Sequence, residues 1–105
     1  MVPVRLILTE IPPGHIQPFH THKNCYEITV VEHGEVSYVE DDSLGNEDVG
    51  EIRNNSKVLR VGDMVFDDNG KRHTVANFSD TYAKVLTTQT PRPYTRAFTP
   101  DWNEN

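Results

Sequence analysis

The sequence predicts an all-β protein built from short antiparallel strands. Helical periodicity is almost absent along the 105 residues, and runs rich in Val, Ile, Thr, Tyr and Phe recur instead. Gly, Pro, Asn and Asp separate these runs at close intervals, as they do in turns. Many short strands joined by turns are typical of an antiparallel sandwich or barrel.

Nine strands are expected, each a run of strand-forming residues that ends at a turn signal. They cover residues 4–10, 19–22, 26–32, 35–40, 51–53, 57–60, 64–67, 73–77 and 83–88. The turns between them are Pro12-Pro13-Gly14, His33-Gly34, Gly45-Asn46, Asn54-Asn55, Gly62-Asp63 and Asp68-Asn69-Gly70. No internal repeat or low-complexity segment interrupts this pattern.

The length fits one domain over residues 1–105. The polar cluster at residues 40–48 is expected to form a solvated hairpin tip. Residues 89–105 contain three prolines after Thr90 together with Tyr94, Phe98 and Trp102. Because Pro interrupts both helices and central strands, this C-terminal segment is expected to be an extended arm.

Charge and composition exclude several classes of partner. The net charge is −6, with no basic run, so neither nucleic acid nor an anionic membrane is expected as a partner. The apolar N-terminal stretch is interrupted by Pro3, Arg5 and Glu10 and is too short for a signal sequence or membrane span. A single cysteine, Cys25, forms no internal disulfide and suits a reducing compartment, so a cytoplasmic location is expected.

Two histidines at alternate positions suggest a metal site. In a strand, residues i and i+2 face the same way, so His20 and His22 project together. Glu27 follows after a short turn, within reach of the same point, and His73 opens a later strand after another turn. Imidazoles with a carboxylate, leaving positions for water, form an open shell suited to Fe, Mn, Ni or Zn.

These residues stand in two glycine-framed motifs. The first reads G-x5-H-x-H-x4-E-x6-G, at Gly14, His20, His22, Glu27 and Gly34. The second contains Gly62, Gly70, His73 and Asn77. Both resemble the motifs of the cupin superfamily, in the same order, and the resemblance covers residues 14–77. One position departs from the family pattern, because Asp68 stands where a proline is usual.

The resemblance implies a double-stranded β-helix, that is, a jelly-roll cupin barrel. It implies that His20, His22, Glu27 and His73 bind one divalent metal ion per chain, Fe, Mn, Ni or Zn. The glycines are then turn residues and Asn77 a structural hydrogen-bonding residue. Acceptors for the second ring nitrogen of the histidines are expected near the site, with Thr29, Asn77 and Gln17 as candidates.

Other residues have plainer interpretations. His15 and His33 lie beside turns and are expected at the surface. Cys25 is expected to be a small buried filler or a rim group, since no separate base stands beside it as nucleophilic use would require. The aromatic residues Tyr26, Tyr38 and Phe66 are expected in the core or the pocket wall.

The functional hypotheses fall into two classes. The first is a metal-dependent enzyme acting on a small organic molecule, with a dioxygenase or another oxidoreductase reaction preferred and isomerase, decarboxylase and lyase reactions left open. The second is a non-catalytic module that binds a sugar or an organic acid. A homodimer is expected, because Ile28 and Val30 would point away from the Glu27 face and need cover.

Overall fold

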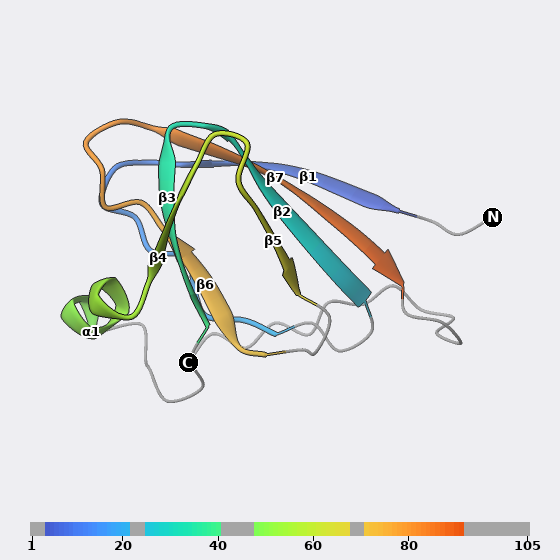
Figure 1. The fold of residues 1–105 in the computed structure, drawn as a ribbon, viewed down its shortest axis with the longest axis horizontal. Helices are drawn as coiled ribbons and strands as arrows, with labels where there is room; N and C mark the ends of the chain where they lie inside the picture. Colours follow the sequence, from blue (N-terminus) through green and yellow to red (C-terminus); the bar gives the residue numbers. More distant parts are fainter. Residues whose placement is uncertain (1–3, 22–24, 41–47, 68–70, 92–105) are drawn as a thin grey trace.

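Two antiparallel sheets face each other in the computed structural model, which describes residues 4–21, 25–40, 48–67 and 71–91 (Figure 1). The larger sheet contains, in spatial order, β1 (Arg5–Ile11), β7 (Ala83–Pro91), β2 (Cys25–His33) and β5 (Met64–Asp67). The smaller contains β4 (Lys57–Arg60), β3 (Glu35–Glu40) and β6 (His73–Ala76). The predicted all-β antiparallel class is therefore confirmed.

The register of the larger sheet decides which residues face inward. Glu27 lies opposite Gln89 on β7 and opposite Asp67 on β5, and all three are buried. Because side chains alternate along a strand, the neighbouring residue Ile28 points outward, where it lies opposite Thr88 and Phe66. Strand β2 thus turns Glu27 toward the interior and Ile28 toward the outer side of the sheet.

The segment before β2 extends the smaller sheet beyond β6. Ile16 forms a bridge with Ala76 and His20 with His73, and the backbone N–H of His20 and of His73 each donate to the carbonyl of the other at 2.9 Å. The strand predicted at residues 19–22 is therefore present only as an irregular edge segment over its described part. His22 lies outside the described residues.

One predicted strand is wrong. Residues 51–53 belong to a helix, α1 (Val49–Asn54), which buries Ile52 alone. The side chain of Asp48 caps this helix by accepting a hydrogen bond from the Glu51 N–H at 3.3 Å. An acceptor three residues before an acidic residue is a helix-start signal, and it outweighs the strand propensity of so short a run. With six residues, α1 is the longest helix in the described ranges, far too short to cross a membrane.

Buried apolar side chains form two clusters. One fills the space between the sheets and consists of Ile11, Val31, Val36, Leu59, Val75, Ala83 and Val85. The other contains Phe19, Val39 and Ile52 and lies where α1 and the segment before β2 cover the outer side of the smaller sheet. Figure 1 shows α1 beside this smaller sheet, away from the larger one. The outer side of the larger sheet is thus left uncovered by α1.

Asn77 and Gly34 fix the turns that hold the sheets in place. The Asn77 amide donates to the carbonyls of Ile11 and Thr81, both at 2.8 Å, and its oxygen accepts from Ser79. The structural role predicted for Asn77 is confirmed. Gly34, at φ +75°, is the single residue between β2 and β3, which lie in different sheets.

Strand β7 is longer than predicted and continues to Pro91. Gln89 and Thr90, assigned from the sequence to the C-terminal arm, therefore pair with β2 instead. The rest of that arm, residues 92–105, and most of the acidic segment, residues 41–47, lie outside the described residues.

Candidate metal centre

The structure brings three of the four predicted ligands together. One donor atom from each of His20, Glu27 and His73 lies within 4.8 Å of the others, and all three residues are buried. They come from three segments that are distant in sequence: the edge segment before β2, β2 itself and β6. The rings of His20 and His73 meet edge to face, with centroids 4.4 Å apart. The sheet pairing thus creates a cluster that no single segment contains.

Both imidazoles are held in the same way. Nδ1 of His20 lies 3.0 Å from the carbonyl oxygen of Pro18, and Nδ1 of His73 lies 2.9 Å from that of Lys71. A backbone carbonyl can only accept, so each Nδ1 carries a proton, and in the neutral form of each ring Nε2 presents a lone pair. In each case the acceptor lies two residues before the histidine. This arrangement fixes the tautomer that a metal requires.

For Nδ1 of His20 and His73, the acceptors predicted for this role are therefore not the ones used. Thr29 Oγ1 lies 3.3 Å from Thr87 Oγ1, and Asn77 holds a turn. Gln17 contributes its backbone carbonyl, which accepts from the Thr74 hydroxyl. The predicted acceptors were polar side chains, whereas the fold uses main-chain carbonyls, which every residue has and which leave no signal in the sequence.

Glu27 is anchored on its far side by Gln89. The Gln89 Nε2 donates to Glu27 Oε2 at 2.8 Å, while Glu27 Oε1 lies 3.3 Å from His73 Nε2. The two carboxylate oxygens thus have separate tasks, because one is held by β7 and the other faces the histidines. Gln89 is a site residue that the sequence analysis missed, since only the register of β7 against β2 places it there.

The donor set fits a divalent transition metal. Oxygen and nitrogen ligands bind such ions at about 2.0–2.2 Å, so two ligands of one ion lie at most roughly 4.4 Å apart. The three donors already lie close to this limit, and two of them come from imidazoles whose Nε2 carries the lone pair. The buried carboxylate beside the two imidazoles also supplies the negative charge that a cation needs. Small side-chain adjustments would bring all three into one coordination shell.

Charge around His73 favours its protonated form. Burial lowers the pKa of His73, but the hydrogen bond to Glu27, the Lys71 carbonyl and the charges of Glu27 and Asp67 together raise it above its ordinary value of 6.5. Asp67 is buried, with Oδ2 3.4 Å from His73 Nδ1. The negative charge of Asp67 therefore reaches the site. A cluster this rich in negative charge attracts a cation, either a proton or a metal.

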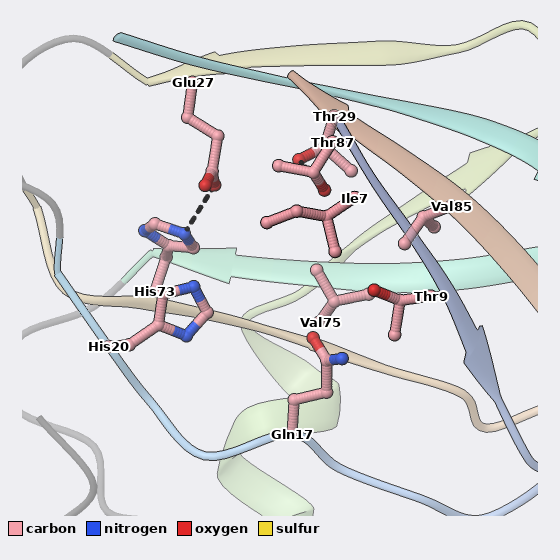
Figure 2. A pocket seen from close by; sticks show the side chains of 10 residues that line it. All are labelled: Ile7, Thr9, Gln17, His20, Glu27, Thr29, His73, Val75, Val85 and Thr87. Carbon is pink, nitrogen blue, oxygen red and sulfur yellow. Dashed lines mark hydrogen bonds and ion pairs between the residues drawn. The ribbon is translucent and has the colours of Figure 1, made fainter. Parts of the chain in front are cut away.

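A cavity of about 60 Å³ opens beside the three donors (Figure 2). Its wall combines aliphatic side chains with hydroxyl and amide groups: Ile7, Val75, Val85, Thr9, Thr29, Thr87 and Gln17. These residues come from both sheets, so the cavity lies inside the barrel. Among the described lining residues, the ionisable ones are the three donors themselves.

The other predicted residues have ordinary positions. His15 and His33 are exposed, as expected, and Cys25 is buried. His22, the fourth predicted ligand, lies outside the described residues, as does Asp68. The described part of the site thus consists of His20, Glu27 and His73.

Comparisons with known proteins agree with this architecture. An uncharacterised protein with a double-stranded β-helix domain from Klebsiella pneumoniae has a TM-score of 0.68 at 16% identity, over 88% of this chain and 70% of that one. The protein TT1209 from Thermus thermophilus has a TM-score of 0.62 at 28% identity, over 82% and 70%. An oxalate oxidase has a TM-score of 0.66 at 27% identity, over 84% of this chain and 42% of the oxidase. A search among curated proteins gave no match.

The sequence also matches a family directly. The match to the cupin domain covers residues 7–88, which include all three described donors and both sheets apart from the start of β1 and the end of β7. The fold predicted from the two motifs, a double-stranded β-helix, is the fold of the similar structures. The chain therefore belongs to the cupin domain family.

Proposed function

We propose that this chain is a metal-dependent enzyme that acts on a small organic molecule inside the barrel, by a dioxygenase or related oxidoreductase reaction. The observation that carries the proposal is the buried cluster of His20, Glu27 and His73 beside an internal cavity. Two histidines and one carboxylate with open positions are the ligand set of many non-haem iron oxygenases. With His22 added, the shell would be the four-ligand set expected from the sequence motifs.

One divalent ion per chain, Fe, Mn, Ni or Zn, would supply a Lewis acid or a redox centre there. The protein's own contribution is to position the ligands. The carbonyls of Pro18 and Lys71 hold the two Nε2 lone pairs toward the centre, and Gln89 holds the Glu27 carboxylate. Aliphatic side chains make part of the wall apolar, and Thr29 and Thr87 offer hydroxyl groups to orient a bound molecule.

The cavity indicates a small substrate. At about 60 Å³ it is far below the roughly 300–1,000 Å³ of pockets that hold drug-sized ligands. The likeness to oxalate oxidase at 27% identity makes small carboxylic acids the first candidates to test. Because this chain spans 42% of that protein, its activity and substrate are a proposal for this chain.

The lining ranks the possible reactions. An isomerase or a lyase generally needs a general acid or base near its substrate. Among the described lining residues, His20, Glu27 and His73 are the ionisable groups, and the proposal uses all three as ligands. Among the reactions considered, redox chemistry at a metal needs the fewest acid–base groups besides the metal ligands. The same observation supports the second candidate, a non-catalytic module that binds a small acid or sugar through the metal and the Thr hydroxyls.

The test is metal-dependent oxygen consumption. Untagged protein would be reconstituted separately with Fe, Mn, Ni and Zn, then assayed with a panel of small mono- and dicarboxylic acids in an oxygen electrode. The proposal expects consumption with at least one redox-active metal, loss of it in His73→Ala, and retention in His33→Ala. Binding of a panel acid without any turnover would support the sensor module instead.

A cytoplasmic location is part of the proposal and rests on the single cysteine.

A further inference from the structure

His73 lies between two buried carboxylates. Its Nε2 lies 3.3 Å from Glu27 Oε1, along the dashed line in Figure 2, and its Nδ1 lies 3.4 Å from Asp67 Oδ2. The exposed fractions are 2% for His73, 6% for Glu27 and 3% for Asp67. The Lys71 carbonyl accepts from the same Nδ1 at 2.9 Å, so Asp67 is the more distant of these two neighbours. One imidazole thus connects Asp67 to the candidate donors, although Asp67 is not one of them.

The alternation of side chains along β5 places Asp67 inside the barrel. Phe66, the residue before it, is 56% exposed and stacks on Tyr26 with ring centroids 6.1 Å apart. These two rings lie on the outer side of the sheet, so the expectation that they line the core or the pocket is wrong. Asp67 points the opposite way and lies across from Glu27 on β2. The pairing of β5 with β2 therefore brings a second carboxylate to the site.

Two carboxylates in this position require positive charge nearby. Glu27 and Asp67 are cross-strand partners, and like charges directly opposite each other on a sheet are destabilising. Burial strengthens the repulsion, because the protein interior screens charges poorly. A cation at the candidate centre relieves it, and two carboxylates balance both charges of a divalent ion. The pair therefore favours a highly charged cation.

Tyr38 and Glu40 lie on the smaller sheet beside His73. The ring centroids of Tyr38 and His73 are 5.6 Å apart, and the Tyr38 hydroxyl donates to Glu40 Oε2 at 3.0 Å. Lys71 directs its side chain to Glu40 as well, with Nζ 3.7 Å from Oε1. Burial raises the pKa of the Tyr38 phenol, and the negative charges of Glu40 and Asp67 raise it further. Tyr38 therefore stays neutral, and Asp67 rather than the phenol brings charge to this side of His73.

We propose that Asp67 is a positioning residue that acts through His73 to stabilise a metal ion in its trivalent state. The inference rests on the proposed metal centre, and it favours iron or manganese there over zinc, which stays divalent. A carboxylate beside the Nδ1–H of a ligating histidine holds the ring and makes Nε2 a stronger donor. Because Coulomb attraction grows with the charge of the ion, Asp67 stabilises a trivalent ion more than a divalent one.

The first measurement is metal affinity in Asp67→Asn, which removes the charge with little change of shape. Zn²⁺ is the redox-inert probe, titrated in competition with a chromophoric chelator at fixed pH. Its dissociation constant should rise about 10- to 100-fold in Asp67→Asn. Asp80→Asn is the matched control, because Asp80 is exposed in the loop between β6 and β7. This control should bind Zn²⁺ like wild type.

The reduction potential separates a charge effect from a displaced ring. Iron-loaded protein would be titrated against redox mediators, with one electron passing between the iron and the mediator. Fe(III) and Fe(II) differ by one charge, half that of Zn²⁺, so the ratio of their affinities should fall about 3- to 10-fold in Asp67→Asn. This change corresponds to a rise in potential of about 30–60 mV. A displaced ring alone would weaken both states equally and leave the potential unchanged.

A second variant guards against a folding defect. Asp67→Val leaves no polar atom buried without a partner and suits a strand, and it should shift the potential in the same direction. Circular dichroism would verify that both variants are folded. A folded, iron-loaded variant with the wild-type potential would overturn the role of Asp67 and leave the metal centre standing, as would a wild type that binds Zn²⁺ but no iron. A wild type that binds neither metal would overturn the metal centre and this inference with it.

Discussion

Gln89 and Glu27 face each other across the pair β7–β2, and the Gln89 amide holds one oxygen of the Glu27 carboxylate at 2.8 Å. This contact leaves the other oxygen to face His73. A residue near the end of the described chain thus orients a candidate ligand in the first motif. The sheet register, rather than proximity in sequence, builds this part of the site.

Replacing Gln89 by Leu should weaken metal binding by about 10- to 100-fold, the usual effect of removing a residue that orients a ligand. Leu keeps most of the volume but cannot donate to Glu27. A competition titration with a chromophoric chelator would measure the dissociation constant. Thr88→Val, on the adjacent outward position, is the control and should leave it unchanged. An equal dissociation constant for Gln89→Leu and wild type would contradict the assigned role.

Removing an imidazole should have a larger effect. We expect about one equivalent of metal in wild type, and little in His20→Ala or His73→Ala, because each loses a donor of the cluster. Elemental analysis of untagged protein gives the answer directly. His33→Ala, at an exposed position, should keep its metal. Loss of metal from His33→Ala but not from His73→Ala would refute the ligand set.

Metal uptake should depend on pH through His73. Burial lowers the pKa of His73, but the Glu27 hydrogen bond, the Lys71 carbonyl and the charges of Glu27 and Asp67 together outweigh burial and raise this pKa in the folded protein. A metal must displace this proton, so apparent affinity should fall by up to about tenfold per unit as pH drops below the folded pKa of His73. Calorimetry in buffers of different ionisation enthalpy would count the proton released. Affinity that stays constant across this range would be inconsistent with His73 as a ligand.

The same shift affects the stability of the metal-free protein. Because the pKa of His73 is higher in the folded than in the unfolded state, protonation stabilises the fold. This contribution is fully present below the ordinary value of 6.5 and is lost as pH rises through the folded pKa. Denaturant titrations of metal-free wild type and His73→Asn at several pH values should show a difference in the free energy of unfolding that shrinks as the pH rises. A difference that grows instead would mean that His73 is buried in its neutral form.

Asn77 should matter for stability rather than for the metal. Its amide satisfies the carbonyls of Ile11 and Thr81, and Asn77→Ala leaves these acceptors without that donor. We expect a loss of about 2–4 kcal/mol in the free energy of unfolding. Asn54→Ala, at an exposed position in α1, should change it by less than about 0.5 kcal/mol. A similar small change for both variants would show that the Asn77 hydrogen bonds add little.

Substitutions at two glycines allow the cost of backbone strain to be measured separately from the cost of a steric clash. Gly14 and Gly34 have nearly the same φ, +79° and +75°, but a Cβ on Gly34 would lie 2.6 Å from the Tyr82 carbonyl oxygen, while one on Gly14 meets nothing within 4 Å. Gly14→Ala should therefore cost about 1–2 kcal/mol from its φ alone. Gly34→Ala should cost at least about 1–3 kcal/mol more, since the strand ends must shift. Equal losses in thermal or denaturant unfolding would show that the turn relaxes freely.

Much of the fold could be predicted from residue patterns, because strand propensity and turn residues act locally. The error at residues 51–53 arose because a run of three residues carries almost no periodicity. The decisive signal there was the cap formed by Asp48 with Glu51, which lies outside the run. The helix α1 was thus specified by the residues that cap its N-terminus rather than by the side chains in its middle.

The candidate ligands of the site could be predicted from the sequence, but the groups that orient them could not. The spacing of His20, Glu27 and His73 within the two motifs marked them as partners, and the sheets bring them together. Gln89 could not be assigned, because the register of β7 against β2 depends on the whole sheet. The Pro18 and Lys71 carbonyls could not be assigned either, since main-chain groups are the same at every position.

Strand β2 presents Glu27 inward and Ile28 outward, so a single ribbon serves the barrel interior and the molecular surface at once. The deletion of one residue upstream within this strand would exchange the two sides. A carboxylate would then stand on the exposed sheet, and an isoleucine would occupy its place among the histidines. A shift in the register of β2 would therefore remove the inward carboxylate and the outward isoleucine together. Either side of the strand can be changed separately only by substituting residues, not by inserting or deleting them.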